Sequence, residues 1–266
     1  MGCPARLKKA SLVGAFFVLV FYLAPAQALC PAPGAVPWHK VQRAVDGDTL
    51  RLADGRSVRL IGLDTPELGR NGKPAEPFAK AAQQRLQALL AASAGQVQLV
   101  LGEQPRDRYG RTLAHAYDRQ GHNLEAQLLA EGLGRFVAIA PNVALVDCHR
   151  TAERQARQAR LGLWRQTPVL QAGQLVRGGF TLVQGQVQRV ERNRGGLWLE
   201  MGDALVLQVA PKHLQDSELV RLQGLAGRRV EARGWVVDRS RRGALRPGQA
   251  RWLLPLTHAS MLEVLP

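Results

Sequence analysis

The chain is poor in cysteine, in acidic residues and in long apolar runs. Its 266 residues include three cysteines, and 21 Asp and Glu stand against 36 Lys and Arg, which gives a net charge of +15. Such an excess of positive charge favours polyanionic partners, either nucleic acid or an anionic membrane surface. A content of 46% hydrophobic and 21% charged residues excludes a disordered chain. The six histidines show no spacing typical of a metal site or of a Ser–His–Asp triad.

An apolar run near the N-terminus is too short for a stable membrane span. Residues 12–23 are apolar apart from Gly14 and follow three basic residues. A span needs roughly 20 apolar residues, whereas Ala26-Gln27-Ala28 fits the small-x-small pattern of a signal-peptidase site. We therefore expect residues 1–28 to be a signal peptide and the protein to be exported, to the periplasm or beyond. The alternative is an uncleaved segment that tethers a binding protein to the membrane.

Two cysteines remain once the predicted signal peptide, which contains Cys3, is removed. In an oxidising compartment two cysteines often pair. The sequence therefore predicts a disulfide between Cys30 and Cys148, and two independent thiols are the alternative.

The order of predicted elements indicates a mainly β protein with helices (α+β) that begins with a five-stranded OB-type barrel. A strong hairpin signal, Asp54-Gly55, joins the second and third strands. Asn123 is expected to cap a short helix that ends near Gly132, and His149 is expected on the surface of the last helix, which Gly162 ends. The predicted elements of this domain, residues 38–166, are strands at 40–45, 49–53, 57–63, 96–101 and 112–117 and helices at 76–92 and 145–161.

The second half of the chain repeats this order. Residues 167–177, with Pro168 and two glutamines, are predicted to form a linker. Residues 178–266 then show three strands, a helix and two strands, which is the order of a second, smaller OB-like barrel. The predicted strands lie at 181–190, 196–201, 205–209, 229–237 and 251–265, with a helix at 211–225.

An acidic cluster in the first domain indicates a metal site. Asp46 and Asp48 are two residues apart and so face the same side of an extended segment, and Asp64 ends the neighbouring strand. Carboxylates that converge in this way are costly unless a cation lies between them. An oxygen-rich set, to which the backbone carbonyl of Thr65 would add, suits Ca²⁺ better than Zn²⁺. Taken singly, Asp-Gly and Asp-Thr-Pro are ordinary turn sequences.

Arginines near this cluster suggest chemistry on phosphate. Arg59 precedes Asp64 by five residues, and Arg111 ends the turn Asp107-Arg108-Tyr109-Gly110-Arg111. The planar guanidinium group binds phosphate oxygens in pairs and stays charged at neutral pH. Glu67 is placed to orient or deprotonate a water molecule. Together these residues predict phosphodiester cleavage.

In combination these motifs resemble those of the staphylococcal nuclease (thermonuclease) family over roughly residues 40–164. The resemblance implies a Ca²⁺-dependent nuclease that cleaves DNA and RNA and leaves 3′-phosphate and 5′-hydroxyl ends. The motifs are Asp46-Gly47-Asp48-Thr49, Arg59, Asp64-Thr65-Pro66-Glu67, Asp107-Arg108-Tyr109-Gly110-Arg111, Gly132-Leu133 and Leu163-Trp164.

The resemblance also assigns a role to each matching residue. Asp48, Asp64 and the Thr65 carbonyl would bind Ca²⁺ with support from Asp46. Glu67 would act as general base, Arg59 and Arg111 would hold the scissile phosphate, and Tyr109 would flank the nucleotide. The chain departs from the family at residues 134–140, which lack the tyrosines that pack on the substrate there, and in a shorter loop after Glu67.

The second domain shows no catalytic pattern but carries a basic loop. Arg239, Arg241 and Arg242 lie between its fourth and fifth predicted strands, where OB barrels often contact oligonucleotides. A merely solvated loop is the alternative. The tryptophans at 198, 235 and 252 either stack on bases or belong to the core. A non-catalytic nucleic-acid-binding protein on the same scaffold is the second functional hypothesis, and no protein partner can be inferred.

Overall fold

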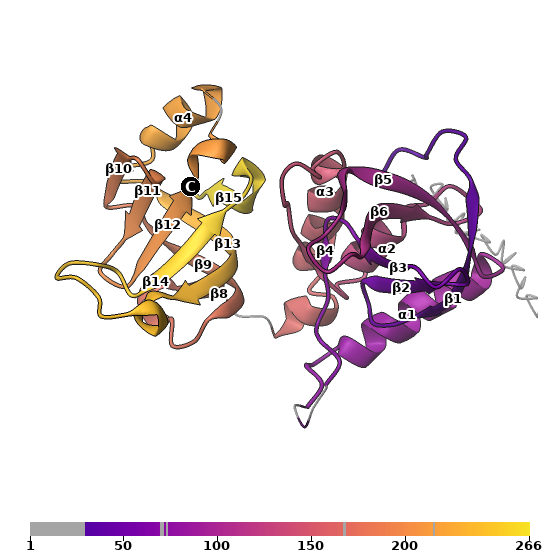
Figure 1. The fold of residues 1–266 in the computed structure, drawn as a ribbon. Helices are drawn as coiled ribbons and strands as arrows, with labels where there is room; N and C mark the ends of the chain where they lie inside the picture. Colours follow the sequence, from indigo (N-terminus) through magenta and orange to yellow (C-terminus); the bar gives the residue numbers. More distant parts are fainter. Residues whose placement is uncertain (1–29, 70–71, 73, 167–168, 215) are drawn as a thin grey trace, which may run out of the picture.

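The computed structural model describes residues 30–266 except 70–71, 73, 167–168 and 215. The predicted signal peptide therefore lies outside the described residues. The chain forms two β-rich domains that lie side by side (Figure 1). Among the described residues, no helix combines the length and the apolar character needed to cross a bilayer.

The first domain is a closed five-stranded barrel, which confirms the predicted α+β fold with an OB-type barrel. The strand order around it is β1-β2-β3-β6-β5; β3 and β6 are parallel, and the other pairs are antiparallel. Its strands are β1 (Trp38–Ala44), β2 (Thr49–Leu52), β3 (Ser57–Leu60), β5 (Gln96–Arg106) and β6 (Thr112–Tyr117).

Alternation along the strands separates the barrel core from the face that carries polar residues. On β3, Val58 and Leu60 are fully buried inside the barrel, so Arg59 between them points outward. Helix α1 (Ala79–Ala92) buries the apolar face that its sequence predicts, although it begins three residues later than expected. Helix α2 (Leu124–Ala130) is capped as predicted, because the Asn123 side chain accepts a hydrogen bond from Ala126 N.

The predicted strand at 57–63 is wrong at its end. Strand β3 stops at Leu60, and a turn at Gly62, with φ of +84°, redirects the chain into β4 (Leu63–Asp64). Strand β4 pairs with β7 (Arg135–Phe136), and Asp64 lies opposite Arg135. The break moves Asp64 out of the barrel wall and places it beside a residue 71 positions later.

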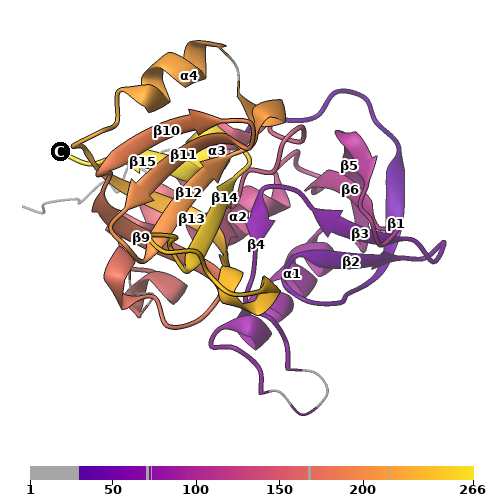
Figure 2. The same ribbon diagram turned by 60° about the vertical axis from the view of Figure 1, so that its left-hand side comes forward.

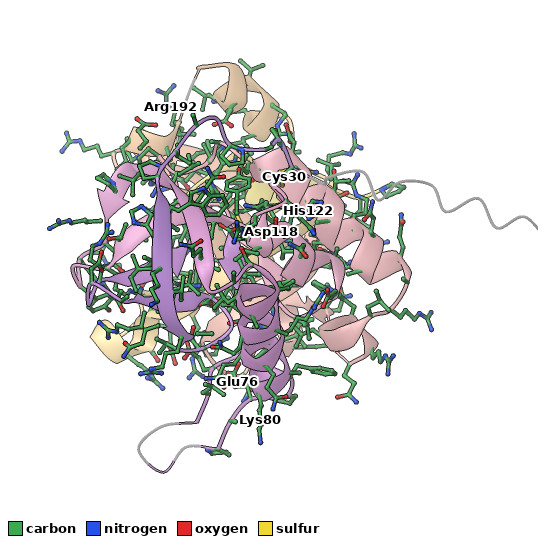
Figure 3. The ribbon with its side chains drawn as sticks, turned by 90° about the vertical axis from the view of Figure 1, so that its right-hand side faces the viewer. Cys30, Glu76, Lys80, Asp118, His122 and Arg192 are labelled. Carbon is green, nitrogen blue, oxygen red and sulfur yellow. A yellow bond between two sulfur atoms is a disulfide. The ribbon has the colours of Figure 1, made fainter. Side chains whose placement is uncertain are left out.

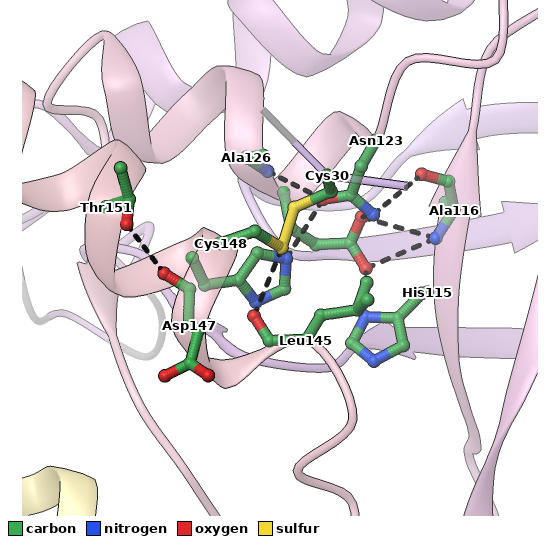
Figure 4. Close-up of a disulfide and its surroundings, with 11 residues drawn as sticks. Cys30, His115, Ala116, Asn123, Ala126, Leu145, Asp147, Cys148 and Thr151 are labelled. Atoms are coloured by element: carbon green, nitrogen blue, oxygen red, sulfur yellow. Dashed lines mark hydrogen bonds and ion pairs between the residues drawn. A yellow bond between two sulfur atoms is a disulfide. The ribbon is translucent and has the colours of Figure 1, made fainter. Parts of the chain in front are cut away.

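Helix α3 (Val146–Gln158) carries the disulfide. Cys30 and Cys148 are joined by an S–S bond that closes a loop of 118 residues (Figure 4). The predicted helix end at residue 161 is wrong: α3 ends at Gln158, and both Arg160, with φ of +51°, and Gly162, with φ of +49°, lie in the left-handed region after it. Gly162 instead opens a short 3-10 helix, η1 (Gly162–Arg165).

His149 is buried, contrary to the surface position expected for it. Its side chain fits above Gly62, where an added Cβ would lie 2.2 Å from Nδ1, and its Nε2 donates to Asn123 Oδ1 over 3.0 Å. Burial, together with the neighbouring His115, lowers the pKa of His149 to about 3. The disulfide sulfurs beside it are already bonded to each other, so this Cys30–Cys148–His149 cluster is no metal site.

The depressed pKa of His149 predicts acid sensitivity. Below pH 6.5 His149 binds a proton in the unfolded chain but not in the folded chain. The free energy of unfolding therefore falls as the pH drops from 6.5 towards 3. Between about pH 7 and pH 5, the wild-type protein should lose about 2 kcal/mol more unfolding free energy than His149→Gln. Urea denaturation at the two pH values measures this difference, and equal losses in both proteins would contradict it.

The second domain repeats the strand pairing of the first. A three-stranded meander is followed by a parallel pair, β12 with β14, which corresponds to β3 with β6, and β13 then pairs antiparallel with both β14 and β9. The elements of this repeat are β9 (Gly179–Gln186), β10 (Arg189–Asn193), β11 (Gly196–Met201), β12 (Leu205–Val209), η3 (Pro211–His213), α4 (Asp216–Gln223), β13 (Arg229–Asp238) and β14 (Trp252–Leu256).

Three predictions for this domain are corrected. The predicted strand at 181–190 divides into β9 and β10 around Val187. The last predicted strand, 251–265, divides into β14, η5 (Ala259–Met261) and β15 (Leu262–Val264). The predicted linker contains β8 (Val169–Gln171) and η2 (Ala172–Gln174), and β8 extends the second sheet by pairing parallel with β9.

Helix α3 of the first domain packs against strand β13 of the second domain where the two domains meet (Figure 2). The Arg157 guanidinium donates to both carboxylate oxygens of Glu231, at 2.8 and 3.0 Å, and Arg233 pairs with Glu153. The backbone of Ala138 is also held from the second domain, because its carbonyl accepts a 2.6 Å hydrogen bond from Thr257 Oγ1. Buried charge pairs across the contact fix how the second domain sits on the first.

Candidate active site

Three strand ends bring the acidic cluster to the outer face of the first barrel. Asp48 precedes β2, Asp64 ends β4, and Arg59 on β3 lies between them. The Arg59 guanidinium forms an ion pair with the Asp48 carboxylate and lies 3.3 Å from Asp64 Oδ1. A single guanidinium therefore contacts both carboxylates.

Hydrogen bonds hold the two acidic segments together. Thr65 donates to Asp48 Oδ2 from its backbone N–H, at 3.0 Å, and from its hydroxyl, at 3.1 Å. Asp46 accepts a 3.1 Å hydrogen bond from Asp48 N. Gly47 is required between them, since an added Cβ would lie 2.7 Å from both Ala82 Cβ on α1 and Thr65 Oγ1. The site thus depends on close packing of this turn against α1.

The carboxylates of the cluster need more positive charge than Arg59 supplies. Burial raises the pKa of Asp64 to about 7; Arg59 opposes this shift, and Asp48 adds to it. Burial, with the adjacent Asp48 carboxylate, raises the pKa of Asp46 to about 6. Buried oxygen donors that repel one another are what a hard divalent cation stabilises. The donor set of Asp48 and Asp64, with Asp46 and the Thr65 segment beside them, therefore fits Ca²⁺.

Arg111 lies on the same outer face as Arg59. In the parallel pair of β3 and β6, Arg59 lies opposite Leu113, and Arg111 is two residues before Leu113, so the two arginines point to the same side. Asp107 holds Arg111 in place, accepting 2.9 Å from its backbone N and 2.7 Å from its Nε. The two Nη groups of Arg111 form no hydrogen bond with the described residues and remain available to a ligand.

Two of the predicted site residues in this domain, Tyr109 and Glu67, are exposed. Tyr109 is 68% exposed, and the guanidinium groups of Arg108 and Arg111 lie 4.7 and 5.7 Å from the centre of its ring. Glu67 lies where the chain returns to α1: its backbone N donates to Glu76 Oε2, and Figure 3 labels Glu76 near the start of that helix. Glu67 and Asp64 line the same opening.

Comparison with known proteins agrees with this geometry. The sequence model of the staphylococcal nuclease homologue family matches residues 57–166. Over about 130 residues, the chain is 35% identical to the thermonucleases of Staphylococcus intermedius and Staphylococcus hyicus, covering 47% of this chain and 74% and 75% of theirs. It is 33% identical to the endonuclease YncB of Bacillus subtilis, of which it spans 60%.

The chain belongs to the staphylococcal nuclease family. The match to the family model ends at residue 166, just before the second domain begins. Residues 38–166 are called the nuclease domain below.

Sequence reasoning missed one residue of the nuclease site, Arg135. The pairing of β4 with β7 places its Nη1 4.0 Å from Asp64 Oδ2, and the guanidinium lies 5.5 Å from the ring centre of Phe180 in the second domain. The only signal in the sequence is a basic residue after Gly134 in a segment that otherwise appears apolar. Its contact with Asp64 depends on a strand pairing 71 residues apart, which no local pattern reveals.

An interdomain cleft of about 620 Å³ opens in front of Asp64 and Glu67. Arg135 lines it from the nuclease domain, Arg177 from the connecting segment, and Phe180 and Trp235 from the second domain. Sequence reasoning placed no side chain of the second domain next to the metal site. The second domain therefore forms part of the wall of the opening in front of Asp64 and Glu67.

Arg239 and Arg241 of the predicted basic loop do not line this cleft. They belong to η4 (Arg239–Arg242), which follows β13. Arg239 is engaged within the second domain: it donates to Ala250 O over 3.3 Å, and its guanidinium lies 5.9 Å from the Trp198 ring centre. Arg241 is exposed, and the side chain of Arg242 is not among those described.

Proposed function

We propose that this protein is an exported, Ca²⁺-dependent nuclease that hydrolyses phosphodiester bonds of DNA and RNA. The observation that carries the proposal is the position of Arg59 between the carboxylates of Asp48 and Asp64. A cation on those oxygens and a guanidinium beside them would face the same phosphate. The names of the relatives, thermonuclease and endonuclease, support this reading.

The side chains divide the reaction between them. Glu67 orients a water molecule and accepts its proton as the water oxygen attacks phosphorus. Arg59 and Arg111 donate hydrogen bonds to the phosphate oxygens, on which negative charge grows in the transition state. The bond from phosphorus to the 5′ oxygen breaks, and that oxygen takes up a proton from solvent as it leaves. The products are a 3′-phosphate and a 5′-hydroxyl.

Asp48, Asp64 and the Thr65 carbonyl would hold the cation, with Asp46 supporting Asp48. When bound, Ca²⁺ adds positive charge beside a non-bridging phosphate oxygen. Export rests on the N-terminal sequence, where the predicted signal peptide, residues 1–28, precedes a cysteine that is paired in the folded domain.

We propose three functional units: the signal peptide, the nuclease domain and an OB-like accessory domain, 178–266, joined through residues 167–177. Arg241 of the accessory domain, with Arg239 and Arg242 nearby, would add phosphate contacts that weaken as salt rises. These contacts would not depend on the nucleotide sequence, because they involve only the sugar-phosphate backbone of the nucleic acid.

Metal removal tests the proposal. Plasmid DNA and single-stranded DNA should be degraded in Ca²⁺ and remain intact in excess EGTA, with activity restored by added Ca²⁺. A kinase that labels 5′-hydroxyl ends should label the products directly, without prior phosphatase treatment. The protein would be a binding protein on a nuclease scaffold if it retained DNA in a mobility-shift assay yet cleaved nothing in Ca²⁺.

A further inference from the structure

The outer face of β13 runs from the domain contact to the active site. Glu231, Arg233 and Trp235 alternate along this strand, so their side chains share one face. Glu231 pairs with Arg157 and Arg233 pairs with Glu153, both on α3 of the nuclease domain. Two ion pairs thus anchor the strand, and the third side chain of the row, Trp235, reaches the interdomain cleft.

Trp235 belongs to an aromatic pair with an open side. Phe180 lies opposite it on β9, and the two rings meet edge to face, with centres 5.1 Å apart and an interplanar angle of 76°. The Arg135 guanidinium lies 5.5 Å from the centre of the Phe180 ring, and Trp235 remains 40% exposed. Of the two, Trp235 offers the freer surface, and Phe180 fixes its orientation.

A continuous set of contacts joins this pair to the metal site. Trp235 touches Phe180, Phe180 lies under Arg135, and Arg135 lies 4.0 Å from Asp64. Arg177, an exposed residue, lines the same cleft. Cationic side chains beside an exposed aromatic ring, next to a site that handles phosphate, are the elements of single-strand nucleic-acid binding.

We propose that Trp235 is a stacking platform for an unpaired base next to the scissile phosphate, and that the second domain thereby selects single-stranded substrate. This proposal rests on the proposed nuclease function. A base can lie on the tryptophan ring only if it has left its duplex, because paired bases expose their edges and not their faces. Duplex DNA would then be cut mainly where it opens.

Substitution of Trp235 tests the platform in the full-length protein. In EGTA, where no cleavage occurs, Trp235→Ala should bind a fluorescein-labelled single-stranded oligonucleotide about tenfold more weakly by anisotropy, because base stacking on an aromatic side chain contributes this much. In Ca²⁺, KM for the same strand should rise about tenfold and kcat should stay close to wild type. Trp235→Phe should retain most of the binding.

An abasic strand separates stacking from any structural effect of the substitution. The wild-type protein should bind an oligonucleotide with abasic sites about tenfold more weakly than the intact strand, and Trp235→Ala should show little further loss on it. Trp38→Ala is the matched control, since Trp38 is 43% exposed on β1 and does not line the cleft. It should behave as the wild type on both strands.

The remaining outcomes would contradict either the stacking proposal or the nuclease function. Wild-type affinity and KM in Trp235→Ala, or equal losses on intact and abasic strands, would end the stacking proposal. The wild-type protein compared on the two strands tests base recognition without any variant, so poor folding of Trp235→Ala does not decide the matter. Trp235-dependent binding without cleavage in Ca²⁺ would overturn the nuclease function and leave the platform intact.

Discussion

Arg59→Ala is expected to lower kcat for DNA cleavage by about 100- to 1000-fold. Removing one preorganised donor to a developing negative charge has an effect of this size, and Arg59 also holds Asp48 and Asp64 together. Arg59→Lys should remain well below wild type, because an ammonium group keeps the charge and loses the planar pair of donors. Initial rates of single-stranded DNA hydrolysis at saturating Ca²⁺ measure both variants.

Arg56→Ala is the matched control on the same hairpin. Arg56 is exposed and pairs with Asp54, away from the acidic cluster, so its loss should leave the rate unchanged. Circular dichroism spectra that match the wild type would show that the Arg59 variants are folded. Full activity of Arg59→Lys would refute the two-donor role of this guanidinium.

Arg233→Met is expected to lower the free energy of unfolding by about 3 to 5 kcal/mol. Arg233 is 7% exposed and Glu153 3% exposed, so the substitution leaves a buried carboxylate without its cation. Glu153 also accepts a 2.8 Å hydrogen bond from Phe136 N on β7, the strand that pairs with β4 and Asp64. Loss of Arg233 should therefore also weaken the position of Asp64 and reduce activity.

A second substitution distinguishes lost charge compensation from lost packing. Adding Glu153→Gln to Arg233→Met should restore most of the stability, because a neutral amide needs no cation and its oxygen still accepts from Phe136 N. Arg229→Met is the control and should unfold as the wild type does, because Arg229 is exposed at the start of the same strand. Urea denaturation gives the midpoints, and an unchanged midpoint in Arg233→Met would contradict the role of this pair.

The barrel and much of its acidic site could be predicted because their signals are local. Asp54-Gly55 fixes a hairpin, Asn123 caps α2, and period-two alternation identifies the strands. Asp48 and Thr65 are 17 positions apart, so one hairpin brings the motif segments around Asp48 and Asp64 together. Short-range geometry of this kind follows directly from sequence.

The rest depends on contacts between distant segments. Arg135 reaches Asp64 through a strand pair formed 71 residues away, and His149 is buried because α3 closes over Gly62. Trp235 reaches the cleft because ion pairs 74 and 80 residues apart dock the second domain. Among the tryptophans left undecided, Trp252 is core at 3% exposed and Trp235 is not. A local sequence pattern does not predict which distant glutamate will form an ion pair with a given arginine.

The disulfide between Cys30 and Cys148 makes the conformational stability of this enzyme depend on the redox state of its compartment. By chain-entropy arguments, a covalent link that closes a loop of this length limits the unfolded ensemble enough to contribute about 5 kcal/mol. That contribution is absent wherever glutathione keeps thiols reduced. A protein that degrades genetic material is then least robust inside the cell that makes it and gains its full resistance to unfolding only after oxidation.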